Sequence, residues 1–154
     1  MAQRMRDAAN RRNRQFGRHG AAMVEMAIIL PVCLLLLLSV FDFGRLMMMQ
    51  QLLENAARSG ARLAVTNTTT LATSNIQNYV TQCLSGQSLT NMTIQVYQVD
   101  PSTGNNLGTW SNAPLGSYIA VEIDGNFTPI VPRLSLIPNP LPMAVKAMMI
   151  CEAN

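Results

Sequence analysis

Apolar and polar residues are distributed unevenly along the chain, and their pattern predicts a membrane segment near the N-terminus. Residues 1–20 are hydrophilic, whereas residues 21–41 read AAMVEMAIILPVCLLLLLSVF, with Glu25 and the thiol of Cys33 as the only ionisable side chains. About 20 apolar residues in a helix are enough to cross the hydrocarbon of a bilayer. We therefore expect a single transmembrane helix over residues 21–42.

Helical periodicity continues beyond the membrane segment, over residues 43–65. Apolar and small residues recur there at three- and four-residue spacing, and Glu54 precedes Arg58 by four residues, the favourable order for an ion pair. The stripe has two interpretations: it packs against the chain's own C-terminal domain, or against a helix of another subunit, which its small residues would allow to approach closely. Its members are Leu46, Met49, Leu53, Ala56, Gly60 and Ala64.

Residues 66–154 predict a small external domain. The polar stretch 66–73 ends the long helix, after which a short helix is expected, and alternating polar and apolar residues predict strands. The proline-rich stretch 128–142 is expected to be irregular or an edge segment. The fold class is therefore α+β: a long N-terminal helix that continues into a pilin-like domain with a short helix and an antiparallel sheet. The expected elements are a helix over 74–84, strands over 93–99, 118–123 and 144–151, and a loop over 100–116.

The charge distribution predicts the orientation of the membrane helix. The chain has 11 Lys and Arg against 8 Asp and Glu, and the basic side chains are concentrated in the first twenty residues. A basic arm is typical of nucleic-acid binding, but this arm leads directly into an apolar span, so a lipid bilayer and no nucleic acid is the expected partner. Lys and Arg remain on the cytoplasmic side, which places residues 66–154 outside the membrane. The arginines of the arm are Arg4, Arg6, Arg11, Arg12, Arg14 and Arg18.

A cleaved secretory signal is the alternative interpretation of this N-terminus, but no A-x-A-like cleavage site follows the apolar run.

Enzymatic function is not expected. The chain has one His and three Cys, too few for a zinc site or a Cys/His nucleophile, and phosphate-binding and metalloprotease motifs are absent. We predict no catalytic residues, no cofactor and no metal. An enzyme domain on a membrane anchor would need the scattered external carboxylates to converge. These are Asp100, Glu122, Asp124 and Glu152.

The segment RRNRQFGRHG followed by AAMVEMAIILPVCLLLLL resembles the processing site of type IV prepilins and pseudopilins. A basic leader ends in Gly20, and Glu25 is the fifth residue after it. The order of Glu, Pro, Asp-Phe-Gly and Ala-Ala-Arg-x-Gly-Ala-Arg over residues 17–65 is similar to the N-terminal signature of TadE-like proteins of the Tad (Flp) pilus system. Ala21 and Met26 depart from the major pilins, and the mature chain would have 134 residues (154 − 20). Both observations favour a pseudopilin or minor pilin.

The resemblance implies a structural role in Tad pilus assembly, and hence in adhesion, biofilm formation or secretion. A prepilin peptidase would remove residues 1–20 by cutting between Gly20 and Ala21. The other implied partners are the Tad inner-membrane assembly platform, a companion pseudopilin and the major Flp pilin. The implied location is the bacterial inner membrane, single-pass, with a cytoplasmic N-terminus and a periplasmic C-terminal domain, and later the extracellular pilus. The alternative is an uncleaved, membrane-tethered periplasmic binding or adhesion module.

Glu25 has a chemical reason to take part in assembly. An ionised carboxylate within a bilayer costs about 2.5–3.5 kcal/mol on insertion scales, so it needs a cation or the interface. Cleavage would free an α-amine on Ala21, about one helical turn away, on the same or a neighbouring subunit. The alternative is that Glu25 merely extends toward the cytoplasmic edge of the membrane.

Two further features concern conformation. Pro31 removes one hydrogen bond from the membrane helix and predicts a kink or a local loosening. Cys83 and Cys151 both fall in the external domain, where an oxidising periplasm would favour a disulfide. Such a bridge would be worth about 4 kcal/mol in the chain-entropy model, and the alternative is two buried free thiols.

Overall fold

The computed structural model describes residues 2–84, 86–87, 89–130 and 139–152, and it gives only the backbone for residues 2–19 and 21. The element order is α1 (Ala2–Thr66), α2 (Thr73–Cys83), β1 (Thr90–Val99), β2 (Asn106–Gly108), β3 (Tyr118–Phe127) and β4 (Leu141–Ile150). The chain divides into two compact units, residues 1–41 and residues 42–154. The expected segments 43–65 and 66–154 therefore belong to one unit.

The first unit consists of helix alone. Most of its described apolar side chains are exposed, with Ile29 46% and Met23 75% accessible. The helix from Ala22 onward is long and apolar enough to cross a membrane, with a mean hydropathy of 2.6 in its most apolar window. A row of large exposed apolar side chains is stable only in lipid or against other helices. We therefore describe this stretch as a membrane anchor.

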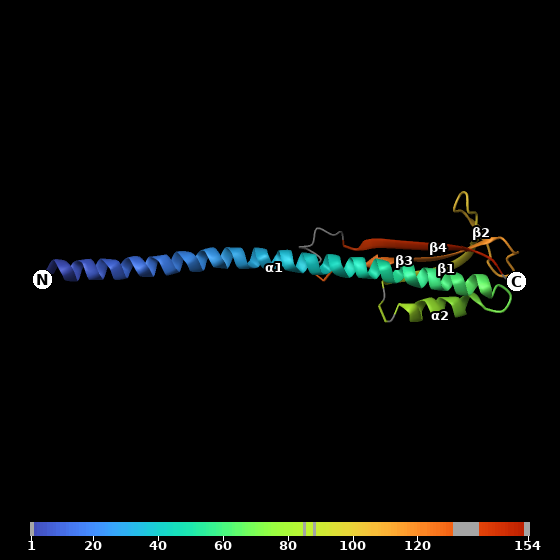
Figure 1. Cartoon of the computed structure of the whole chain (residues 1–154), viewed down its shortest axis with the longest axis horizontal. Coiled ribbons are helices and arrows are strands. Elements are labelled where there is room, and N and C mark those ends of the chain that lie inside the picture. Colours follow the sequence, from blue (N-terminus) through green and yellow to red (C-terminus); the bar gives the residue numbers. More distant parts are fainter. Residues whose placement is uncertain (1, 85, 88, 131–138, 153–154) are drawn as a thin grey trace. The chain divides into compact units, whose positions relative to one another are not determined.

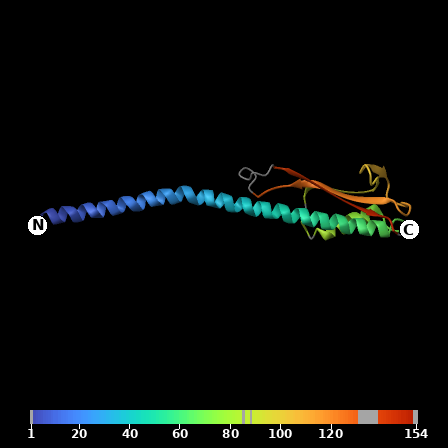
Figure 2. The same cartoon turned by 45° about the horizontal axis from the view of Figure 1, so that its top comes forward.

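The second unit is an α+β domain, as predicted. Its four described strands form one antiparallel sheet in the order β2-β1-β3-β4. Figures 1 and 2 show the sheet and α2 lying beside the C-terminal half of α1. The amide of Gln77 in α2 donates to the carbonyl of Ile94 in β1 at 2.8 Å, so α2 is fixed at the β1 side of the sheet.

The stripe on α1 forms the centre of this domain's core. Leu53, Ala56 and Ala64 are buried among residues of α2, β3 and β4. A Cβ at Gly60 would clash with Val80 of α2 and would lie 3.6 Å from Val121 of β3. The glycine thus permits the close approach of α1 to both elements. Of the two interpretations of the stripe, packing within the same chain is confirmed.

The strands are longer than the alternation predicted, and one was missed. β1 begins three residues before the expected strand, and β3 extends to Phe127 rather than ending at residue 123. The loop 100–116 contains the three-residue strand β2, which pairs with the end of β1. Residues 141 and 142 form the start of β4, residues 139 and 140 lie just before it, and residues 131–138 of the predicted irregular stretch lie outside the described residues.

Candidate assembly segment

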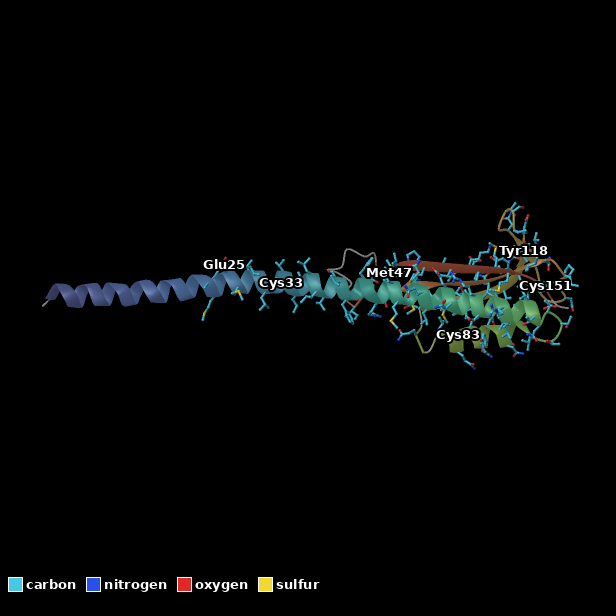
Figure 3. The ribbon with its side chains drawn as sticks, viewed as in Figure 1. Glu25, Cys33, Met47, Cys83, Tyr118 and Cys151 are labelled. Carbon is cyan, nitrogen blue, oxygen red and sulfur yellow. The ribbon has the colours of Figure 1, made fainter. Side chains whose placement is uncertain are left out.

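Glu25 lies on the exposed surface of α1, among apolar side chains of the membrane anchor. Val24 and Met26 on either side are 63% and 60% accessible. Figure 3 shows Glu25 and Cys33 at separate positions along this helix. The carboxylate is thus an isolated polar group in an otherwise apolar surface, where pairing with a cation is worth far more than in water.

The predicted processing site is helical. α1 runs through Gly20 and Ala21 without a break, and Gly20 is exposed, with no other atom within 4 Å of a Cβ built on it. A larger side chain at Gly20 would therefore fit the helix itself. An effect of such a substitution on cleavage would report recognition by a peptidase rather than disruption of this chain.

Pro31 does not end the helix. The structure assigns one uninterrupted helix from Ala2 to Thr66 with Pro31 inside it. The predicted kink remains a prediction, and the prediction that helix continues to about residue 65 is confirmed.

At the first residues of the second unit, α1 carries a buried carboxylate. Asp42 is 1% accessible, and its Oδ1 accepts the backbone N–H of Ile130 at 3.1 Å. The Nη1 of Arg45 lies 3.7 Å from the same oxygen, and the guanidinium of Arg45 lies 5.3 Å from the centroid of the Phe127 ring. This cluster joins the start of the domain's helix to the segment after β3. Hydrogen bonds and a neighbouring charge are what a buried carboxylate requires.

The predicted bridge between Cys83 and Cys151 is not present in the structure, in which none of the three cysteines forms a disulfide. Cys83 ends α2. Cys151 lies at the opposite end of that helix, because its Sγ is 3.9 Å from the carbonyl of Ala113, and neighbouring Trp110 donates its indole N–H to Thr73, the first residue of α2. An eleven-residue helix at about 1.5 Å per residue separates the two thiols by more than a disulfide spans.

The carboxylates of the folded domain that an enzyme would need do not converge on one point. Asp100 accepts hydrogen bonds from Ser102 and Thr103 within its own turn, which lowers its pKa. Glu122 accepts the hydroxyl of Tyr97 on the face of the sheet away from α1. Burial, followed by the charge of Glu122, raises the pKa of Asp124 on the same face. Within the described residues, no three His, Cys, Asp or Glu side chains are grouped to hold a metal ion.

Comparison with known proteins identifies the N-terminal part of the chain. The family model described as TadE-like protein matches residues 20–62. Residues 20–62 are thus similar to TadE-like proteins, and we call them the TadE-like segment. No curated protein and no solved structure matches the chain. The TadE-like segment begins at the predicted cleavage position, contains the apolar helix, and ends within the stripe that forms the core of the domain.

Sequence reasoning missed the role of Asp42. The Asp-Phe-Gly triplet contributed to the resemblance, but no function was assigned to its carboxylate. A usable signal was present, since Asp42 is the first acidic residue after the apolar run. Its partner Ile130 is 88 residues away in the chain, so only the fold reveals the contact.

Proposed function

We propose that this protein is a pseudopilin or minor pilin of a Tad pilus system, with a structural rather than an enzymatic role. The observation that carries the proposal is the TadE-like segment 20–62, which starts at Gly20 and joins an exposed apolar helix to a folded domain. A membrane-inserted helix that can later pack against other helices suits a subunit that moves from a bilayer into a fibre.

In this proposal a prepilin peptidase removes residues 1–20 at the cytoplasmic face of the inner membrane. The anchor then holds the domain formed by residues 42–154 in the periplasm. The mature protein engages the inner-membrane assembly platform, a companion pseudopilin and the major Flp pilin, and thereby supports adhesion, biofilm formation or secretion. The basic leader supports the orientation, because positive side chains are retained on the cytoplasmic side.

Cleavage distinguishes this function from that of an uncleaved binding or adhesion module. Intact-mass measurement of the chain, expressed with a prepilin peptidase and extracted from membranes, is expected to show loss of residues 1–20. Gly20→Phe should abolish that loss. Gly44→Phe is the matched control, because Gly44 is also helical, exposed and free of atoms within 4 Å of its built Cβ.

Pilus formation tests the remaining part of the proposal. A strain that lacks this chain should lose its pili and regain them with the wild-type chain. A full-length mass in cells that contain the peptidase would favour the tethered module, and normal piliation without the chain would contradict a role in assembly.

A further inference from the structure

β4 is one of the two edge strands of the described sheet, and it has the longer edge. β4 pairs with β3 over ten consecutive residues without a shift in register, from Leu141 opposite Phe127 to Ile150 opposite Tyr118. In the described structure no strand pairs with its other side. By contrast, β1 carries register shifts on both of its sides. Bulges and short strands normally protect sheet edges from pairing with another chain, and β4 has neither.

The backbone groups at this edge can be assigned from the hydrogen bonds of Cys151. Its N–H donates to the carbonyl of Ser117 at 2.8 Å, and its carbonyl accepts the N–H of Gly116 at 3.0 Å. Both groups of Cys151 therefore point toward the β3 side. Because successive residues of a strand point their N–H and C=O to opposite sides, alternate residues present these groups to the free edge. They are Ala144, Lys146, Met148 and Ile150.

Two residues that usually protect an edge do little here. Pro142 faces the free edge like these four residues, and as a proline it has no N–H to offer there. Because it is the second residue of β4, the missing donor affects only the start of the strand. The amine of Lys146 is drawn across the sheet, where it donates to the carbonyl of Gly104 at 2.7 Å and lies 5.0 Å from the centre of the Tyr97 ring. Its charge is thus held away from the edge.

A groove runs beside the free edge, between β4 and α1. It consists of four successive hollows, and each shares lining residues with the next. Gln50 and Val145 line both the first and the second hollow, Arg58 and Met149 line both the second and the third, and Arg62 lines both the third and the fourth. The groove begins at Leu46 and Leu141 and ends at Thr66 and Ile150. β4 therefore runs in the same direction as α1 (Figure 1).

This direction argues against a second copy as the occupant. An antiparallel β4–β4 pair would orient the two α1 helices in opposite directions, which two anchors in one membrane cannot adopt. In a parallel pair related by a twofold axis, each residue would lie opposite its own copy. A parallel ladder instead requires that a residue whose N–H and C=O point to the partner strand lies opposite one whose groups point away. The other edge strand, β2, has three residues, and the N–H of its Gly108 is already bonded to the side chain of Asn106.

We propose that the β4 edge accepts an extended segment of a different protein chain, which adds as an antiparallel fifth strand between β4 and the exposed side of α1. Main-chain hydrogen bonds to residues 144–150 supply affinity, as in other cases of strand addition. Arg62 is exposed and has no ion pair within the described residues, although Glu152 lines the same hollow, and Arg58 pairs with Glu54 at 3.1 Å. An acidic side chain on the helix-facing side of the incoming strand would complement these arginines, and apolar side chains on its other side would contact Met148 and Ile150.

A second copy is excluded as the occupant only if the chain is anchored in a membrane, as the proposed function requires. The free edge of β4 does not depend on that anchoring. Hydrogen exchange on the isolated full-length chain in detergent tests the edge alone. The amides of Ala144, Lys146, Met148 and Ile150 should exchange rapidly, and those of Met143, Val145, Ala147 and Met149 slowly. Equal protection of both sets would overturn the proposal regardless of function.

Photo-crosslinking in cells tests the occupant. A benzophenone amino acid at Asn55, which lines the groove, should give an adduct with a different protein, and the peptide joined to Asn55 should have an alternating pattern with an acidic residue. The double variant Ala144→Pro/Met148→Pro removes two edge donors but no donor to β3. It should lower the adduct yield by roughly tenfold or more, and Ala144→Gly/Met148→Ala should not.

A second variant guards against a folding defect caused by the prolines. Gln50→Trp fills the groove from the helix side, and Gln51→Trp is its control, because Gln51 is exposed on the same helix but does not line the groove. Only Gln50→Trp should abolish the adduct. A dominant adduct with a second copy, no adduct, or an adduct insensitive to both the proline pair and Gln50→Trp would overturn the proposal. If this chain proves unnecessary for pili while the adduct follows the expected pattern, the proposed function fails and the strand-accepting edge stands.

Discussion

At Gly60, α1 closely approaches α2. Val80, which a Cβ at Gly60 would meet, is itself completely buried and has little room to move. Gly60→Ala should therefore destabilise the domain by about 1–3 kcal/mol through overpacking. Thermal unfolding of the full chain in detergent, followed by circular dichroism, measures the effect.

Gly44→Ala is the matched control on the same helix. No atom lies within 4 Å of a Cβ at Gly44, so only helix propensity changes, and alanine should stabilise by about 1 kcal/mol. If the two substitutions shifted the unfolding midpoint equally, the close packing at Gly60 would be contradicted.

Asp124 is a residue whose charge opposes folding. Burial and the neighbouring charge of Glu122 raise its pKa from 3.8. A carboxyl whose pKa is raised in the folded state stabilises the fold below its unfolded pKa, and this contribution is lost as the pH rises through its folded pKa. Asp124→Asn should therefore raise the unfolding midpoint at pH 7, and the gain should shrink as the pH falls through the folded pKa and be absent below the unfolded value of about 4.

Asp100 provides the opposite case. The hydroxyl and N–H of Ser102, together with the hydroxyl of Thr103, lower its pKa. A lowered carboxyl pKa stabilises the fold above the unfolded pKa, and the contribution is lost as the pH falls through the folded pKa. Asp100→Asn should lower the midpoint at pH 7 and have little effect in strong acid. The same sign for both variants at pH 7 would contradict this account.

At the scale of elements, the two external cysteines report on the ends of α2 and β4. Cys151 is buried at the end of β4, with its Sγ 3.6 Å from the carbonyl of Val65, whereas Cys83 is half-buried at the end of α2. In the folded chain, Cys83 should react with iodoacetamide faster than Cys151, which requires local opening. Peptide mass spectrometry after timed labelling measures both rates.

The same digests test whether the structure or the sequence-based expectation about these cysteines is right. Reducing and non-reducing samples from quenched cells should give identical Cys83 and Cys151 peptides. A linked pair would restore the predicted bridge and would require α2 to move away from the position that Gln77 and Thr73 give it.

At the scale of the whole molecule, the prediction concerns Glu25 and the assembly of subunits. Glu25→Gln should insert into the membrane at least as well as the wild type, because the cost of the charge disappears. Cleavage should persist, since Gly20 and the leader are unchanged. If cleavage frees the Ala21 amine as proposed, pili should become few, because that amine would lose its carboxylate partner where water is scarce. Glu25→Asp should be intermediate or poor, since its side chain is one methylene shorter.

Immunoblotting for the trimmed chain, together with pilus counts, separates processing from assembly. Asp100→Asn is the control, since it removes a carboxylate from an exposed turn of the external domain. Normal piliation of Glu25→Gln cells would show that the carboxylate has no role in assembly.

The sequence predicted those features that depend on neighbours along the chain. The apolar run and the helical stripe from Leu46 to Ala64 predicted α1, and the alternation over residues 93–99 predicted β1. The runs 118–123 and 144–151 predicted β3 and β4, and these elements appear in the structure. The TadE-like signature is likewise contiguous, at residues 20–62. β2 was not predicted, because three exposed residues are too few to show an alternating pattern.

Only the tertiary structure decided which distant residues meet. Asp42 is buried because the chain returns to it at Ile130, and Cys83 and Cys151 are apart because α2 lies between them. The free edge of β4 follows from the strand order, which places the last strand at a border of the sheet and beside α1. Periodicity specifies which face of an element is buried, whereas the identity of the neighbour depends on contacts that compete across the whole chain.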